Sequence, residues 1–382
     1  MNLIALSIPG FFALIAVELL VARWRHKRVY RFNDAVTDIS CGIGSQMIGV
    51  LLSATLFGAY VWVYQHHLLD LEALLPGPWL WVFGMLAVDF AYYWWHRKSH
   101  EVNLLWAAHI VHHQSEDYNL AVALRQAWFT GATSIVFYLP LALLGLPPVV
   151  YGVSSAVNTL YQFWIHTELI DRVGPLEAVL NTPSHHRVHH AVNARYLDRN
   201  YAGILILWDR LFGSFAREEE RPVYGTTTPL GSFNPLWANF EHLRAIARKC
   251  AALPRLRDRL GAIFGHPAWH PSRPTAPLSH DALVARLTSK YDPPAALWIK
   301  LYVAANFAIA VAITVFLLFF KKQLSADLIG SLVGLVLATT AVWGGLLERR
   351  RWAPWLEAAR LAAAAVILAV MIERGVLTQL LG

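Results

Sequence analysis

The sequence predicts an all-α membrane protein that crosses the bilayer about eight times and carries a histidine-rich helical cap at one membrane face. Hydrophobic residues make up 56% of the 382 residues and charged residues only 15%, whereas a soluble domain carries about 25% charged residues. The hydrophobic residues also gather in stretches of about 20 residues, the length that a helix needs to cross the hydrocarbon core.

Residues 1–78 form an N-terminal region with two predicted spans, at 3–22 and 39–63. The basic sequence RWRHKR follows the first span. Basic loops stay in the cytoplasm under the positive-inside rule, so this loop is predicted to be cytoplasmic and the N-terminus to lie outside.

Residues 79–216 form the predicted core. A third span, at 79–95, returns the chain to the cytoplasmic side. A membrane hairpin at 128–165 then crosses and returns, with its turn at LGLPP, because consecutive prolines break a helix. The polar segments of the core are therefore all expected on the cytoplasmic side, where they form the cap.

Two regions complete the chain. Residues 217–295 are predicted to be a cytoplasmic segment that is basic and then rich in proline. Residues 296–382 contain three more spans, at 297–320, 324–347 and 355–372. These last spans carry no recognisable chemistry; they could be structural, form an oligomer surface or shape a path for lipid. The sequence leaves the oligomeric state open.

The net charge of +7 does not indicate a nucleic-acid-binding protein. The basic residues lie beside hydrophobic spans, and no nucleic-acid motif accompanies them. The two cysteines, Cys41 and Cys250, fit no metal or disulfide spacing, so both are expected to be reduced.

The histidines are concentrated in the predicted core. Of the 17 histidines in the chain, ten lie between residues 95 and 192: His96, His100, His109, His112, His113, His166, His185, His186, His189 and His190. The first two are one helical turn apart, and the pattern HxxHH occurs twice, as HIVHH and HRVHH. Histidines at these spacings are expected to share a helix face. Isolated surface or core histidines would not produce three such clusters.

This arrangement predicts two bound metal ions. Imidazole is a ligand for Fe, Zn, Cu and Ni, and the clusters offer more nitrogens than one metal can use. Carboxylates are expected beside the rings to fix their tautomers, and the available ones are Glu101, Glu116, Asp117, Glu168 and Asp198. Asp89, inside the third span, is either a further such group or a structural carboxylate bound to a neighbouring span.

The sequences around these histidines are also informative. The three clusters have the sequences HRKSH, HIVHH and HHRVHH. Longer segments at and after the clusters are AYYWWHRKSHEVNLLWAAH, GPLEAVLNTPSHHRVHH and NYAGILILWDRLFGSF. The three short motifs resemble the histidine boxes of the membrane-bound fatty acid hydroxylase and sterol desaturase superfamily. Over roughly residues 89–215, the longer segments resemble the sequences of the alkylglycerol monooxygenase branch and its bacterial relatives.

The resemblance implies a di-iron monooxygenase that uses O₂ to hydroxylate a C–H bond of a lipid taken from the bilayer. For this branch, it implies attack on the carbon next to the ether oxygen of alkylglycerols, with a tetrahydropterin or an external electron donor as reductant. By motif, the implied metal ligands are His96, His100, His109, His112, His113, His166, His186, His189 and His190. Glu101 matches a carboxylate beside the first box and is the implied catalytic residue.

Further residues are assigned by position. Candidates for an extra ligand or a group behind the ligands are His185, Asp89, Asp117 and Gln162, the last standing where some relatives have a histidine. Candidates for contact with substrate or reductant are Tyr118, Asn119, Arg125 and Gln126.

Two other functions are alternatives. One is a sterol or fatty-acyl hydroxylase or desaturase that draws electrons from an electron-transfer protein. The other is a metal transporter, which would need ligands near the bilayer midplane, whereas these histidines stand at span ends. The expected location is a bacterial inner membrane, or the endoplasmic reticulum in a eukaryote, with the active site on the cytoplasmic face.

Overall fold

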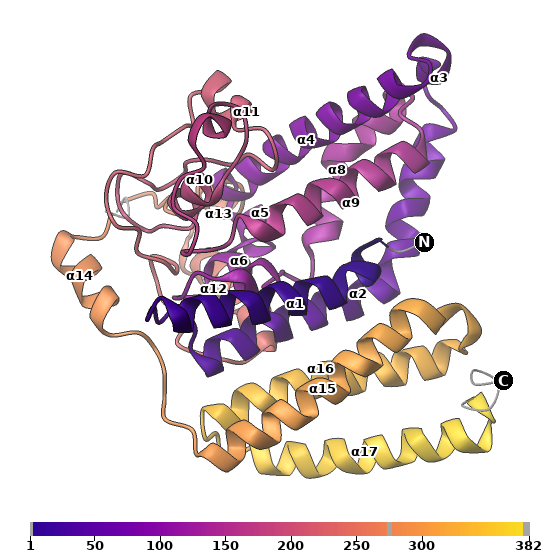
Figure 1. Cartoon of the computed structure of the whole chain (residues 1–382), viewed down its shortest axis with the longest axis vertical. Helices are drawn as coiled ribbons and strands as arrows, with labels where there is room; N and C mark the ends of the chain where they lie inside the picture. Colours follow the sequence, from indigo (N-terminus) through magenta and orange to yellow (C-terminus); the bar gives the residue numbers. More distant parts are fainter. Residues whose placement is uncertain (1–2, 273–276, 377–382) are drawn as a thin grey trace.

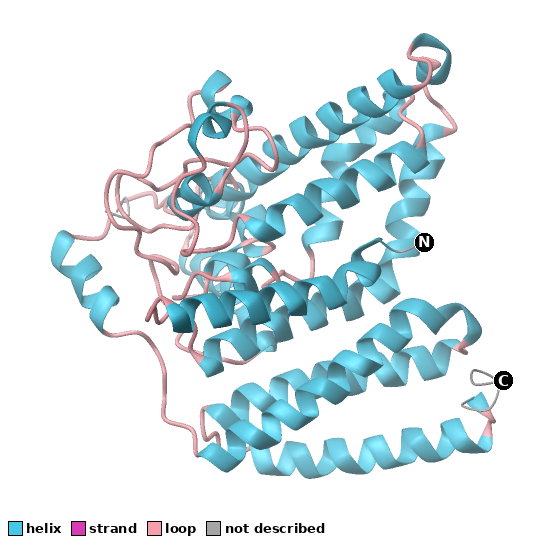
Figure 2. Cartoon of the chain, in the orientation of Figure 1, coloured by secondary structure: helices cyan, strands magenta, loops and turns pink. Residues whose placement is uncertain are grey.

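The computed structural model describes residues 3–272 and 277–376. These residues contain α-helices, short 3₁₀ helices and loops, with two isolated β-bridges and no strand (Figure 2). The predicted all-α class is confirmed.

Eight long helices dominate the described residues. They are α1 (Leu3–Trp24), α2 (Phe32–Tyr64), α4 (Pro78–Glu101), α8 (Thr130–Leu144), α9 (Pro148–Trp164), α15 (Leu297–Phe320), α16 (Ala326–Leu347) and α17 (Ala353–Glu373). Each covers one of the predicted spans. Five of them, α1, α2, α15, α16 and α17, are long and apolar enough to cross a membrane. The chain is therefore a multi-pass membrane protein, and the total of eight spans stays a prediction.

The long helices form two layers that share one cap (Figure 1). The helices α1, α2, α4, α8 and α9 lie together, and α15, α16 and α17 form the second layer beside α1 and α2. Buried side chains of α2, including Met47 and Val50, pack against Leu317 of α15 and Val336 of α16. The second layer is thus joined to the first through α2.

One 18-residue helix, seven shorter helices and long loops build the cap at one end of the eight helices named above (Figure 1). They are α5 (Asn103–Ala107), α6 (Ile110–His113), α7 (Leu120–Ala123), α10 (Pro183–His189), α11 (Leu207–Leu211), α12 (Pro235–Ala252), α13 (Leu256–Phe264) and α14 (His280–Thr288). The start of α1, the end of α17 and α3 (Leu71–Leu74) lie at the opposite end.

The hairpin of α8 and α9 turns where the sequence predicts. Pro148 opens α9 at its first turn, where a missing N–H costs nothing. Gly145 ends α8 with φ of 98°, a left-handed conformation that glycine adopts without steric cost. This turn returns α9 to the cap.

The helices α12 and α13 clamp the end of α4 to the cap. Asn103, just after α4, donates its side-chain amide to the carbonyl of Ala262 at 2.8 Å and its backbone N–H to the carbonyl of Gly265 at 2.9 Å. His242 of α12 donates its ring N–H to the Oδ1 of the same Asn103 at 2.7 Å. The segment predicted as a basic cytoplasmic region therefore supports the first histidine pair.

His242 should make the protein less stable in acid. Burial, with a smaller contribution from the charge of Lys249, lowers the pKa of His242 to about 4. The ring is neutral when folded, so the unfolded chain takes up the proton first as the pH falls. Stability is complete above about pH 6.5 and falls by about 3 kcal/mol toward pH 4.

The variant His242→Gln keeps a donor for Asn103 but cannot titrate. We expect its thermal unfolding midpoint in detergent to fall less between neutral and mildly acidic pH than that of the unchanged protein. Equal pH dependence of the two midpoints would show that His242 does not carry this effect.

Candidate metal centre

Buried histidines gather in two groups where the cap meets the long helices. The first histidine group consists of His96, His100, His109, His113 and His189, and the second of His112, His166, His186 and His190. Within each group the candidate donor nitrogens all lie within 4.8 Å of one another. The rings of His113 and His190 stack with their centroids 4.4 Å apart, so the two groups are direct neighbours.

The two HxxHH motifs contribute to both groups in opposite ways. His109 and His113 enter the first group, while His112 enters the second. In the other motif, His186 and His190 enter the second group, while His189 enters the first. Residues four apart stay on one side of a helical turn, and the residue three along points to the neighbouring site. The prediction that all three share one face is therefore corrected.

Backbone carbonyls fix the orientation of four rings. The Nδ1–H groups of His96, His112, His166 and His189 donate to the carbonyls of Tyr201, Arg125, Gln162 and Arg199, at 2.7, 3.0, 2.7 and 2.9 Å respectively. A carbonyl can only accept, so Nδ1 carries the proton and Nε2 keeps its lone pair. No hydrogen bond in the described residues joins a carboxylate to a ring of either group. Carbonyls thus take the place of most of the expected carboxylate partners. Of the predicted carboxylates, Asp198 lies beside a ring, with its Oδ1 3.8 Å from the Nδ1 of His100.

The rings are neutral at physiological pH. Burial lowers the pKa of His112 to about 4 and that of His189 to about 3. Burial and the neighbouring imidazoles hold the pKa values of His166 and His186 well below their usual range. Neutral imidazole is the form that binds metals.

The nitrogen positions fit a cation between the rings. The Nε2 atoms of His112 and His166 lie 3.2 Å apart. Both carry lone pairs, because both Nδ1 atoms hold the proton, and two such acceptors repel each other unless a cation lies between them. The Nε2 atoms of His100 and His189 are buried without a hydrogen-bond partner, an arrangement that normally needs an explanation such as an ion. Both groups therefore fit metal binding.

Two supporting residues were missed in the sequence. Asp209 of α11 accepts hydrogen bonds from the backbone N–H groups of Tyr201 and Ala202, both at 2.8 Å, and it holds the carbonyl that orients His96. Asp38 of α2 pairs with the buried Arg125 at 3.0 Å, and the carbonyl of Arg125 orients His112. A charged residue inside or beside an apolar stretch was the available signal for both.

The other predicted site residues lie outside both histidine groups. Glu101, at the end of α4, accepts from Arg97 at 2.7 Å and from Lys98 at 2.5 Å. Asp89 accepts from the backbone of Ile204 and Leu205 and from the side chains of Asn158 and Trp208, so none of its hydrogen bonds goes to a histidine.

The remaining ligand candidates have other surroundings. Asp117 pairs with Arg31 and Lys290. The ring of His185 packs edge-on against Phe215. The Oε1 of Gln162 accepts from Tyr92 at 2.6 Å, and Gln162 lines a cavity beside the second group.

The candidates for substrate or reductant contact divide in two. Tyr118, Asn119 and Arg125 are buried and bond to the protein itself: Tyr118 donates to the carbonyl of Ile165, Asn119 to that of Val29 and Arg125 to that of Val111. Gln126 is half-buried and lines the cavity. Only Gln126 among them is placed to meet a bound molecule there.

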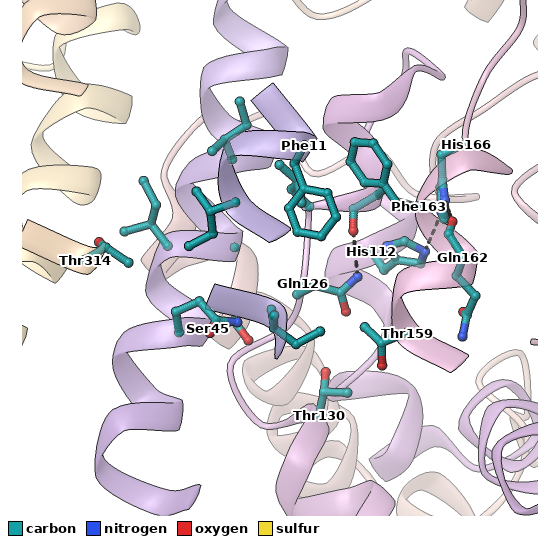
Figure 3. A pocket seen from close by; sticks show the side chains of 18 of the residues that line it. Phe11, Ser45, His112, Gln126, Thr130, Thr159, Gln162, Phe163, His166 and Thr314 are labelled. Atoms are coloured by element: carbon teal, nitrogen blue, oxygen red, sulfur yellow. Dashed lines mark hydrogen bonds between the residues drawn. The ribbon is translucent and has the colours of Figure 1, made fainter. Parts of the chain in front are cut away.

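A cavity of about 340 Å³ adjoins the histidines. His109, His112 and His166 line it, together with residues of α1, α2, α4, α9 and α15. Figure 3 shows His112, His166 and Gln162 on one side of the cavity and Thr314 of α15 on the other. Its volume is at the lower end of the range for small-molecule sites, and most of its lining residues are apolar.

Comparison with known proteins agrees with this arrangement. The sequence model of the fatty acid hydroxylase family matches residues 81–214, which include all nine histidines of the two groups. No solved structure matches the chain.

Three relatives show how far the similarity extends. The alkylglycerol monooxygenase of Homo sapiens is 40% identical over 365 residues, which cover 92% of this chain and 79% of that protein. The alkylglycerol monooxygenase of Caenorhabditis elegans is 31% identical, with 91% and 72% covered. The ornithine lipid hydroxylase OlsE of Rhizobium tropici is 28% identical over 206 residues, with 50% and 59% covered.

Proposed function

Because this chain belongs to the fatty acid hydroxylase family, in the branch of the alkylglycerol monooxygenases, we propose that its substrate is an alkylglycerol lipid. In this proposal the enzyme hydroxylates the carbon next to the ether oxygen. One observation carries the proposal further than similarity does: two buried groups of neutral imidazoles adjoin a mostly apolar cavity. A lipid carbon held in that cavity lies beside the histidines and away from water.

The two histidine groups hold two iron ions in this proposal, one each. Each group offers four or five imidazole nitrogens, which bind iron as well as zinc, copper or nickel. The choice of iron follows from the family similarity. When bound, the irons supply the activation of O₂ that an unactivated C–H bond requires. The fixed Nδ1–H donors to backbone carbonyls keep the Nε2 lone pairs aimed inward before metal arrives.

The protein's own residues position the substrate. The half-buried Gln126 uses its side-chain N–H for the carbonyl of Ala123 at 2.9 Å, which leaves its Oε1 to accept from a hydroxyl of the glycerol group. The apolar walls exclude water, so that the reacting carbon is held beside the histidines.

The reaction balances with a two-electron reductant. One oxygen atom of O₂ enters the C–H bond, and the other leaves as water with two electrons and two protons. The product is a hemiacetal, which breaks into a fatty aldehyde and glycerol. We propose a tetrahydropterin or an external electron-transfer protein as the reductant. The proposal gives no role in reductant binding to three buried residues, because each hydrogen-bonds within the protein: Tyr118, Asn119 and Arg125.

The position of the cap supports a cytoplasmic active site. Arg23 and Arg25 lie at the end of α1 that adjoins the cap, and basic residues favour the cytoplasmic side. The membrane is a bacterial inner membrane or, in a eukaryotic cell, the endoplasmic reticulum. The same arrangement argues against metal transport, because both histidine groups lie at the cap end of the long helices.

The test is metal analysis followed by product analysis. Detergent-purified protein should contain about two irons per chain, one for each histidine group. Under O₂ it should form fatty aldehyde from an alkylglycerol with a tetrahydropterin, or with a ferredoxin and its reductase. A sterol, a fatty acyl lipid and an ornithine lipid serve as competing substrates. Oxidation of one of these lipids, with no aldehyde from the alkylglycerol, would overturn the proposed substrate.

A further inference from the structure

We infer that α15 forms the far wall of the lipid cavity and sets the length of alkyl chain that the enzyme accepts. Three residues of α15, Val311, Thr314 and Val315, line the cavity. Figure 3 shows Thr314 on the side opposite His112 and His166. The inference rests on the proposed function, since it takes the occupant to be the substrate's alkyl chain. It gives the C-terminal helices, which lie outside the matched residues 81–214, a part in the reaction.

The lining of the cavity changes from polar to apolar away from the histidines. Near His112 and His166 lie Gln126, Gln162 and Thr159, as Figure 3 shows. The rest of the wall is mostly apolar: Ile4, Ile8, Phe11 and Phe12 of α1, Ile39 and Ile43 of α2, and Val311 and Val315 of α15. Its polar residues on that side are Ser45 and Gln46 of α2 and Thr314 of α15. A molecule with a polar end and a hydrocarbon chain matches this gradient when its polar end faces the histidines.

Thr314, the polar residue that α15 contributes to the wall, is satisfied within its own helix. Thr314 is buried, and its hydroxyl donates to the carbonyl of Ala310 at 2.7 Å. The hydroxyl hydrogen therefore needs no partner from the cavity, and the wall accepts a terminal methyl group without leaving a donor unpaired.

The wall is held in place by its neighbours. Leu317 of α15 is fully buried against α2 and α16. Phe307 of α15 packs edge-on against Phe12 of α1, with ring centroids 6.1 Å apart, and also contacts Trp343 of α16. Because packed interiors yield little, α15 cannot move outward freely for a longer chain. Chain length is thus limited by the side chains that α15 presents.

Substitutions on α15 test the inference through chain-length preference. Val311→Phe should shorten the cavity, and Val315→Ala should lengthen it. The control is Ile309→Phe, because Ile309 lies on the same helix, is 58% exposed and does not line the cavity. The measurement is kcat/KM for alkylglycerols of increasing chain length, alongside iron content and the thermal midpoint.

For Val311→Phe, we expect the ratio of kcat/KM for long over short chains to fall by about fourfold for each methylene that no longer fits. Val315→Ala should raise that ratio, and Ile309→Phe should leave it unchanged. An unchanged ratio in both cavity variants, with iron retained, would overturn the inference. So would an equal shift in the control.

A second readout separates this inference from the proposed function. Lipids that co-purify with each variant are extracted, and their chain lengths are measured. If the unchanged protein forms no aldehyde from any alkylglycerol, the proposed function fails, whereas a shift of the co-purified chain lengths in Val311→Phe still supports α15 as the far wall. Identical chain lengths of the co-purified lipids in all three variants would contradict the role of α15 as the far wall. If Val311→Phe does not fold, the result for Val315→Ala tests that role.

Discussion

Replacing His112 with alanine is expected to remove one of the two irons and abolish turnover. The second histidine group has four donors against five in the first, so a loss there leaves only three. Changing a residue behind a metal ligand typically costs about 10–100-fold in metal affinity, and we expect the loss of a ligand itself to exceed about 100-fold. His112 also lines the cavity, as do His166 of the same group and His109 of the first group, so the change also alters the cavity wall.

The matched control is His66→Ala, which changes an exposed histidine at the far end of α2 and should keep both irons and full activity. His185→Ala is the closer comparison, because His185 is adjacent to His186 on α10 but outside both groups, and it should also keep both irons. Iron content and aldehyde formation are measured on the same samples. Full iron content in His112→Ala would remove His112 from the metal site.

Replacing Asp38 of α2 with alanine is expected to be the most destabilising single change where the long helices meet the cap. The Asp38 and Arg125 side chains are 0% and 2% exposed and lie 3.0 Å apart. Removing one partner of a buried pair leaves an uncompensated charge, which costs about 3–5 kcal/mol. The change should also disturb the orientation of His112 in the second histidine group, because the Nδ1–H of His112 donates to the carbonyl of Arg125 at 3.0 Å.

A double-mutant cycle isolates this pair. Asp38→Ala combined with Arg125→Met should lower the thermal midpoint less than the sum of the two single changes, since the double variant buries no unpaired charge. Asp327→Ala is the control: it breaks a pair of the same type with Arg374, but both partners are about half exposed, and exposed pairs contribute little. Additive effects of Asp38→Ala and Arg125→Met would rule out a strong interaction.

The sequence predicted the long helices well, except where polar residues extend them. The second span was predicted from residue 39, yet α2 begins at Phe32. Asn33 and Asp38 are buried at its start with partners from the cap. Hydropathy excludes such residues from a span, because it has no information about partners distant in sequence. The third span was likewise predicted to end at residue 95, while α4 continues to Glu101.

The composition of the metal centre was predictable, but its internal division was not. Clustered imidazoles at helical spacing indicated that the histidines would lie together. Which metal each histidine serves depends on how α6 and α10 face each other, and this is a property of the tertiary structure. The hydrogen bonds from the rings to the carbonyls of Tyr201 and Arg199 could not be predicted either, because every residue has a backbone carbonyl and residue type does not identify the acceptor.

Each HxxHH motif contributes histidines to both groups, and this division has a consequence for the assembly of the protein in the membrane. Each group draws donors from α6 and α10, with α4 supplying the first group and the end of α9 the second. Neither donor set exists until chain segments made at different times have been inserted and brought together. A chain stalled before α10 offers only partial coordination to either ion. Full coordination of both ions is therefore expected only in chains in which all of these segments have been inserted.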